Sequence, residues 1–170
     1  MKKLVILTAT FVIVFFSACK KDPLDIPLGT ISVSIDGTKT TFNVQSKAVS
    51  TNTTGTYTLS IEGYKKDPVN SSTKMKLIIS GRNPITPGTF TPNTSSGGTF
   101  ARIQFFQEFI FGLGTLYVSS GSSSNPVIIT LSELSGSSTK GTFKGDLQVS
   151  GVSGTGEKVV LKDGVFNVRF

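Results

Sequence analysis

Short runs of alternating apolar and polar residues fill the chain from residue 29 to residue 170, and clusters of glycine, proline, asparagine and serine separate them. An alternation with a period of two predicts β-strands that bury one face. No stretch in this region keeps a 3.6-residue apolar period over three helical turns, so helices are not expected. The spacing of the runs predicts about ten strands. We therefore expect an all-β fold, a single antiparallel β-sandwich or flattened barrel.

The pair Asp36-Gly37 predicts a two-residue hairpin turn with a defined register. The turn would set opposite one another Ile35 and Thr38, Val33 and Thr40, and Ile31 and Phe42. The residues expected to point inward are Ile31, Val33, Ile35, Phe42 and Val44. The residues expected to face water are Ser32, Ser34, Lys39 and Asn43.

A second Asp-Gly pair, Asp163-Gly164, predicts another hairpin of the same kind. Its turn would set opposite one another Leu161 and Phe166, and Val159 and Val168. It would also bring Lys158 opposite Arg169, a mild repulsion. A bulge or a slipped end is therefore expected at that point.

Further strands are expected between the two hairpins, and one long connection interrupts them. The strands are predicted near Tyr57–Ile61, Lys74–Ser80, Phe100–Gln107, Thr115–Ser119, Val127–Leu134 and Thr142–Val149. The connection, residues 81–98, is longer than loops usually are. It is either a functional surface loop or the site of a short strand at Gly88–Thr91. The order Pro-Gly-Thr-Phe-Thr favours the strand, because it is typical of a turn followed by an extended segment.

The segment from Phe105 to Phe111 holds four phenylalanines within seven residues. Strict alternation cannot bury Phe106, Phe109, Ile110 and Phe111 on one side of a strand. Burial in the core is the favoured interpretation, through a bulge or a loop folded over the end of the barrel. Alternatively Phe106, Phe109 and Phe111 form an exposed contact surface for a ligand or partner. Glu108 would be a candidate for acid–base chemistry if it were buried among them, but an outward-facing glutamate is favoured.

The missing residue types exclude several kinds of chemistry. The sequence has no histidine, and Cys19 is its only cysteine, so Ser-His-Asp and Cys-His nucleophile systems and ordinary zinc sites are excluded. No metal or cofactor is expected. The carboxylates available for acid–base chemistry are Glu62, Glu108, Glu133, Asp146 and Glu157, and each stands where an outward strand or turn residue normally would. The sequence therefore predicts a protein that is not an enzyme.

The N-terminus has the three parts of a lipoprotein export signal. A basic start at Lys2-Lys3 precedes the apolar run Leu4–Phe16, and Ser17-Ala18 leads into Cys19. We expect residues 1–18 to be a cleaved signal peptide, Cys19 to be lipidated, residues 19–28 to be a tether and residues 29–170 to be the β domain. A secreted protein cut near Ala18, with a free thiol, is the alternative.

The charge pattern gives no sign of a nucleic-acid surface. The formal net charge of +7 falls to +5 when Lys2 and Lys3 leave with the signal peptide, and no run of lysine or arginine in the remainder exceeds two residues. A phosphate-binding stripe would need such residues to be gathered together. We therefore expect no nucleic-acid partner.

Two parts of the sequence resemble a known group of proteins. Ile128-Ile129-Thr130-Leu131, then Gly141-Thr142-Phe143, then Asp163-Gly164-Val165-Phe166 follow one another in order, and Lys20-Lys21-Asp22 follows Cys19. The chain resembles uncharacterised all-β lipoproteins of the Bacteroidota type. The resemblance implies an all-β fold and an outer-membrane location, with the cell surface favoured over the periplasm. It implies no activity and no catalytic residues.

These patterns together predict a non-catalytic role in the cell envelope. The membrane would be one partner, through the lipid on Cys19. The expected function is the capture of a small ligand or glycan, with residues 81–98 and the aromatic segment forming a site at one end of the domain. The alternative is a structural or protein–protein component of the envelope, with the aromatic segment or an open sheet edge as the contact.

Overall fold

The structure, a computed structural model, describes residues 25–66, 73–92, 98–110, 113–120, 123–150 and 157–170. This part of the chain contains eleven β-strands and no helix, so the expected all-β fold is confirmed. The strands are β1 (Thr30–Ile35), β2 (Thr38–Phe42), β3 (Val44–Thr53), β4 (Thr56–Tyr64), β5 (Lys74–Gly81), β6 (Gly88–Phe90), β7 (Phe100–Ile110), β8 (Leu113–Ser119), β9 (Ile128–Leu134), β10 (Ser138–Val149) and β11 (Lys158–Arg169). Among the described residues, no helix is long and apolar enough to cross a membrane.

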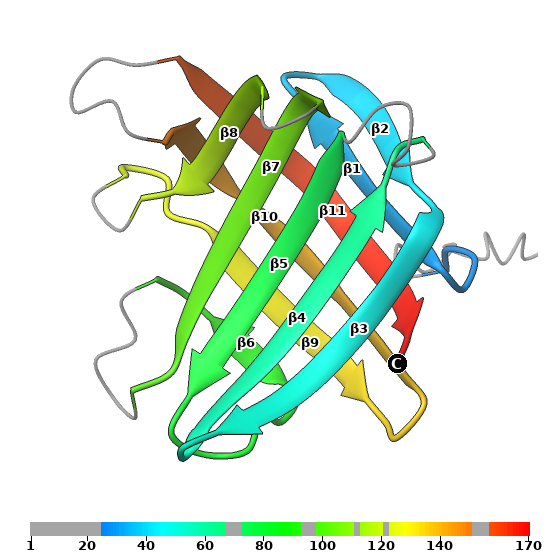
Figure 1. Ribbon diagram of the computed structural model, residues 1–170, viewed down its shortest axis with the longest axis vertical. Helices are drawn as coiled ribbons and strands as arrows, with labels where there is room; N and C mark the ends of the chain where they lie inside the picture. Colours follow the sequence, from blue (N-terminus) through cyan, green and yellow to red (C-terminus); the bar gives the residue numbers. More distant parts are fainter. Residues whose placement is uncertain (1–24, 67–72, 93–97, 111–112, 121–122, 151–156) are drawn as a thin grey trace, which may run out of the picture.

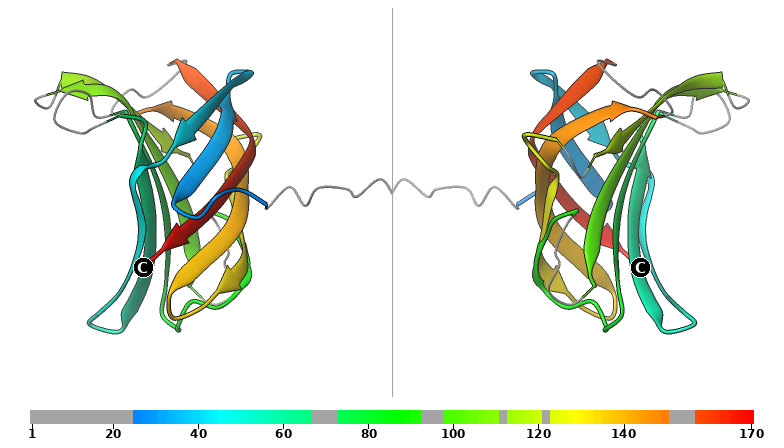
Figure 2. Two further views of the ribbon diagram at one scale, coloured as in Figure 1. Left: turned by 90° about the vertical axis from the view of Figure 1, so that its right-hand side faces the viewer. Right: turned by 90° about the vertical axis from the view of Figure 1, so that its left-hand side faces the viewer.

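The strands form two layers that face each other, as Figures 1 and 2 show. One layer has the order β3-β4-β5-β7-β8, and the other has the order β2-β1-β11-β10-β9-β6. Two seams join the layers. At the first, β8 pairs with the end of β10 over Leu147–Val149. At the second, β11 and β3 share a single parallel pair, Arg169 with Lys47. The result is a flattened barrel that is antiparallel except at this pair.

The hairpin at Asp36-Gly37 forms in the predicted register. Both turn residues have positive φ angles, 47° and 84°, as a two-residue turn of this kind requires. The pairs of β1 and β2 include Ile31 with Phe42, Val33 with Thr40 and Ile35 with Thr38. Ile31, Val33 and Phe42 are buried, Ile35 is half-buried against the core, and Val44 is half-buried at the start of β3.

Ser32 is buried, although alternation predicts that it faces water. Its side of β1 is the outer face of the layer, and Ser32 is only 6% exposed there. The segment before β1 lies on this face: the side-chain amide of Asn167 donates to the carbonyl of Ile26 at 2.9 Å, and the backbone N–H of Gly29 donates to the carbonyl of Asn167 at 2.8 Å. The strand pattern alone does not reveal such a covering segment.

The predicted hairpin at Asp163-Gly164 is wrong. β11 runs through both residues as one strand, with β10 on one side and β1 on the other. Asp163 has a φ of 50°, and the register shifts opposite this point in both neighbouring strands. The Asp-Gly pair therefore makes a bulge, because turns and bulges both use this backbone conformation. The predicted opposition of Lys158 and Arg169 disappears with the turn, and Lys158 pairs with Gln148.

The core lies between the layers and comes from the predicted inward positions. The fully buried side chains on the central strands include Leu59, Ile61, Met75, Leu77, Ile79, Ile103, Ile129 and Leu131. The short strand in the long connection is confirmed as β6, which pairs with β9. The long strand β3 has no counterpart in the sequence prediction, because most of its residues are polar and exposed on both faces.

Candidate functional site

A groove of about 770 Å³ lies on the outer face of the layer that contains β2, β1, β11, β10 and β9. Its hydroxyl-bearing residues are Ser32, Ser34, Thr130 and Thr142, and its charged residues are Lys39, Lys144 and Asp163. Its apolar residues include Ile26, Ile128 and Val165. The groove is thus assembled from five strands and the segment that precedes β1.

Bulges in the strands shape this groove. Strand β10 changes register between Phe143 and Gly145, and β1 changes register between Ser32 and Ser34. Gly145 has a φ of 133°, and a Cβ atom there would come within 2.8 Å of the backbone nitrogen of Val127. Bulges bend strands and redirect side chains, and they often lie beside binding sites. At these bulges the core residues Val33 and Phe143 also border the groove.

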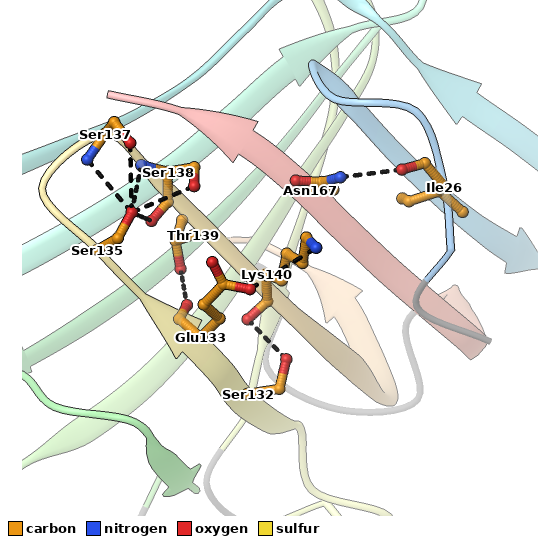
Figure 3. A network of polar contacts seen from close by, with 9 residues as sticks. All are labelled: Ile26, Ser132, Glu133, Ser135, Ser137, Ser138, Thr139, Lys140 and Asn167. Atoms are coloured by element: carbon orange, nitrogen blue, oxygen red, sulfur yellow. Dashed lines mark hydrogen bonds and ion pairs between the residues drawn. The ribbon is translucent and has the colours of Figure 1, made fainter. Parts of the chain in front are cut away.

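The β9–β10 hairpin forms one wall of the groove, and a polar network holds it (Figure 3). The hydroxyl of Ser135 donates to the carbonyl of Ser138 at 3.1 Å and accepts from its backbone N–H at 3.0 Å. The hydroxyl of Thr139 donates to the carbonyl of Glu133 at 2.9 Å, and the Lys140 ammonium lies 3.6 Å from the Glu133 carboxylate. These contacts stabilise the wall without using the groove's own side chains.

The groove combines hydroxyl and charged groups with apolar side chains. The Thr130 hydroxyl shares a hydrogen bond of 3.2 Å with the Thr89 hydroxyl of β6. Two ammonium groups, Lys39 and Lys144, and one carboxylate, Asp163, are among its lining residues. Hydroxyls can donate and accept, whereas ammonium groups only donate and attract anions. The arrangement suits a hydroxylated or anionic ligand.

A second hollow, of about 270 Å³, lies at the end of the barrel near the β1–β2 turn. Asp36, Glu108, Tyr117 and Glu157 are among its lining residues. Burial raises the pKa of the Tyr117 hydroxyl, and a hydrogen bond to Glu157 and the nearby charges of Glu157 and Asp36 raise it further. Asp36 has a structural role here, because its carboxylate accepts the backbone N–H of Val160 at 2.8 Å.

The aromatic segment divides between the core and the outer face. Phe105 is buried, with its ring centroid 5.9 Å from that of Tyr117 and 6.3 Å from that of Phe42. Phe106 is half-buried, and the Lys74 ammonium lies 4.7 Å from its ring centroid. The side chain of Phe109 and the whole of Phe111 lie outside the described residues, as does Cys19.

The structure separates the two parts of the site that the sequence predicts at one end. Residues 81–98 precede Phe100, the first residue of β7, whereas the aromatic segment begins at Phe105 and runs to the other end of that long strand (Figure 1). The described parts of the two segments, residues 81–92 and Phe105–Ile110, therefore lie toward opposite ends of β7. Neither of the groove's lysines was a predicted site residue. The only sequence signal for these lysines is an outward position on an alternating strand. Such a position does not distinguish a residue in a groove from one on a plain surface.

One of the five carboxylates, Asp146, is not exposed to water as the sequence predicts. Glu108 and Glu157 are exposed, and Glu133 and Glu62 form ion pairs with Lys140 and Lys47. Asp146, expected to face outward into water, is buried. Among the described residues, no group of three acidic side chains is placed to hold a metal ion.

Two polar side chains cover Asp146. The ammonium of Lys158 lies 2.5 Å from its carboxylate, and the side-chain amide of Asn125 donates to it at 2.9 Å. The connection before β9 thus folds over the outer face at this point, and alternation along β10 gives no sign of it.

Comparisons with protein-family models, with curated proteins and with solved structures find no significant match to this chain.

Proposed function

We propose that this protein is a lipid-anchored envelope protein that captures a small ligand or glycan in the outer groove and does not transform it. The observation that carries the proposal is the groove itself, a hollow of about 770 Å³ on the outer face of a β-sheet. This volume lies in the range of ligand sites, which is roughly 300–1,000 Å³.

The lining residues favour binding over catalysis. Asp163 is the carboxylate among them, and hydrolysis of a glycosidic bond ordinarily needs two carboxyl groups. Hydroxyls and ammonium groups suit the hydroxyls and acidic groups of a sugar such as a uronic acid or a sulfated unit. The groove lacks an exposed aromatic platform among its lining residues, so recognition would rest on hydrogen bonds and charge.

The position of the groove agrees with an anchored protein. Ile26, which lines the groove, follows the proposed lipidation site Cys19 by seven residues. Seven residues span at most about 25 Å when fully extended. A lipid on Cys19 would therefore keep the groove close to the membrane, where a captured molecule could be passed on to other envelope components. We place the protein in the outer membrane, facing the cell surface.

Binding measurements on groove variants test this proposal. We would measure binding of acidic and neutral oligosaccharides to the full chain by calorimetry. Lys144→Gln should weaken binding of an acidic ligand about tenfold, the loss expected for one charge-assisted hydrogen bond. The matched control is Lys76→Gln, on the outer face of the opposite layer, and it should leave affinity unchanged. Equal affinities for both variants and the unchanged chain would refute the groove as the site.

Location is tested separately by adding protease to intact cells. Cleavage of the protein in intact cells is the expected result for a surface-facing anchor. Protection until the cells are permeabilised would place it in the periplasm. Loss of membrane association in the Cys19→Ala variant is expected if this cysteine carries the lipid.

A second function, in assembly of the envelope, is favoured by a different feature, a sheet edge that among the described residues has a neighbouring strand only at Lys47. This edge belongs to β3 and lies in the layer opposite the groove.

A further inference from the structure

The outer edge of β3 has almost no neighbouring strand. β3 pairs with β4 from Val44 to Thr53, but on its other side it pairs with β11 only at Lys47. Among the described residues, no strand lies against the stretch Ala48–Thr53 on that side. Every residue of this stretch except Ala48 is exposed. The end of the β3–β4 hairpin stands apart from the other layer in both views of Figure 2.

The hairpin turn determines which backbone groups point away from β4. Thr54 and Gly55 form a two-residue turn with φ angles of 51° and 78°, and Thr53 pairs with Thr56 across it. In an antiparallel ladder, hydrogen-bonded and non-hydrogen-bonded pairs alternate along the strand. The pair that closes a two-residue turn is hydrogen-bonded, so the N–H and C=O groups of Ser50 and Asn52 point away from β4. They form a regular row for an incoming strand.

This stretch lacks the features that normally protect an exposed edge. Proteins discourage edge-to-edge pairing with charged residues, proline, bulges or very short edge strands. Ala48–Thr53 has no charge and no proline, and the bulge in β3 lies before it, between Val44 and Lys47. The other edges are protected: β6 has three residues, and β2 carries Lys39.

Apolar side chains add to the exposed surface at the start of this edge. Val49 is 42% exposed on β3. Phe170, which follows the end of β11 beside Lys47, is 43% exposed. Exposed apolar groups next to unpaired backbone groups are typical of a contact surface.

We propose that the stretch Ala48–Thr53 pairs with the same stretch of a second copy of the chain. Two identical strands in antiparallel order form a two-fold contact in which each supplies what the other lacks. With Thr51 opposite Thr51 of the second copy, Ser50 lies opposite Asn52 and Val49 opposite Thr53. The outward groups of Ser50 and Asn52 then face each other, and no two charges meet although each chain is basic overall. Pairing would join the two layers that contain β3 into one continuous sheet and leave both grooves open. The inference is independent of the groove's function.

The test is the mass of the full chain in detergent, measured by sedimentation over a range of concentrations. The unchanged chain should form a dimer. Asn52→Pro removes one outward N–H group without touching the bonds to β4, and it should leave a monomer, whereas Asn52→Ala should remain dimeric. Thr51→Lys adds a charge at the centre of the contact and should also give a monomer. Its matched control, Thr51→Gln, keeps the length without the charge and should remain dimeric.

Hydrogen exchange gives a second measurement that does not depend on any variant. The amides of Ser50 and Asn52 should exchange more slowly as the protein concentration rises. A monomer at every concentration, or a dimer that persists in both Asn52→Pro and Thr51→Lys, would overturn the proposal. A monomer whose Ser50 and Asn52 amides become protected only in a complex with another protein would also overturn it, and would assign the edge to that partner.

Discussion

The ion pair between Asp146 and Lys158 lends itself to a double-mutant cycle, because its two members differ sharply in exposure. The Asp146 side chain is 2% exposed, so its carboxylate has lost almost all contact with water, whereas the Lys158 side chain is 48% exposed. Besides Lys158, the carboxylate has the amide of Asn125 at 2.9 Å. The pair joins β10 to the start of β11 and holds the connection before β9 against them.

Removing the lysine should cost much more than removing an ordinary surface charge. Loss of one partner of a fully buried pair costs about 3–5 kcal/mol, and exposed pairs contribute about 0–1 kcal/mol. Because water reaches the lysine but not the carboxylate, we expect Lys158→Ala to lower the free energy of unfolding by about 2 kcal/mol. Asp146→Asn keeps the shape of the side chain and its contact with Asn125, but it leaves no buried charge that needs a cationic partner. Lys158→Ala should therefore cost much less in an Asp146→Asn background.

The assay is urea unfolding of the full chain followed by circular dichroism. The coupling free energy between the two substitutions should be about 1.5 kcal/mol. The exposed pair Lys140–Glu133, with side chains 38% and 51% exposed, is the control, and its coupling should be under about 0.5 kcal/mol. Similar coupling free energies in the two cycles would refute the argument that burial of Asp146 makes its ion pair contribute to the stability of the fold.

Two further predictions concern the core. Burial raises the pKa of Tyr117 above its ordinary value of 10.0, so the folded state resists ionisation that the unfolded chain accepts, and stability should fall as the pH rises past 10 towards the folded pKa. Tyr117→Phe should remove that part of the fall in urea unfolding at pH 9–11, and an unchanged slope would contradict the assignment. Gly141→Ala should cost about 1–3 kcal/mol or more, because the new Cβ would lie 2.5 Å from the Phe166 ring and closer still to the Thr130 carbonyl. A loss of under about 0.5 kcal/mol in thermal or urea unfolding would show that β9 and β10 can move apart freely.

The two Asp-Gly pairs show how far local sequence determines this fold. At Asp36-Gly37, the apolar alternation on both sides fits two short strands, and no other strand competes for the second one, so the hairpin forms as predicted. At Asp163-Gly164, the same dipeptide lies between β10 and β1, which together pair along most of β11. Pairing on both sides favours one long strand over a turn, and the dipeptide then serves as a bulge. The choice depends on neighbours that are distant in the sequence.

The candidate sites likewise depend partly on the local sequence and partly on neighbours that are distant in the sequence. Alternation was sufficient to predict the all-β class, the first hairpin and most of the buried side chains, because apolar residues with a period of two must bury one face of a strand. It could not predict that Ile26 and Asn125 cover parts of the outer face, that bulges hollow it between Lys39 and Lys144, or that β3 keeps a bare edge. These features arise where segments far apart in the sequence meet, and only the tertiary structure decides which strands become neighbours.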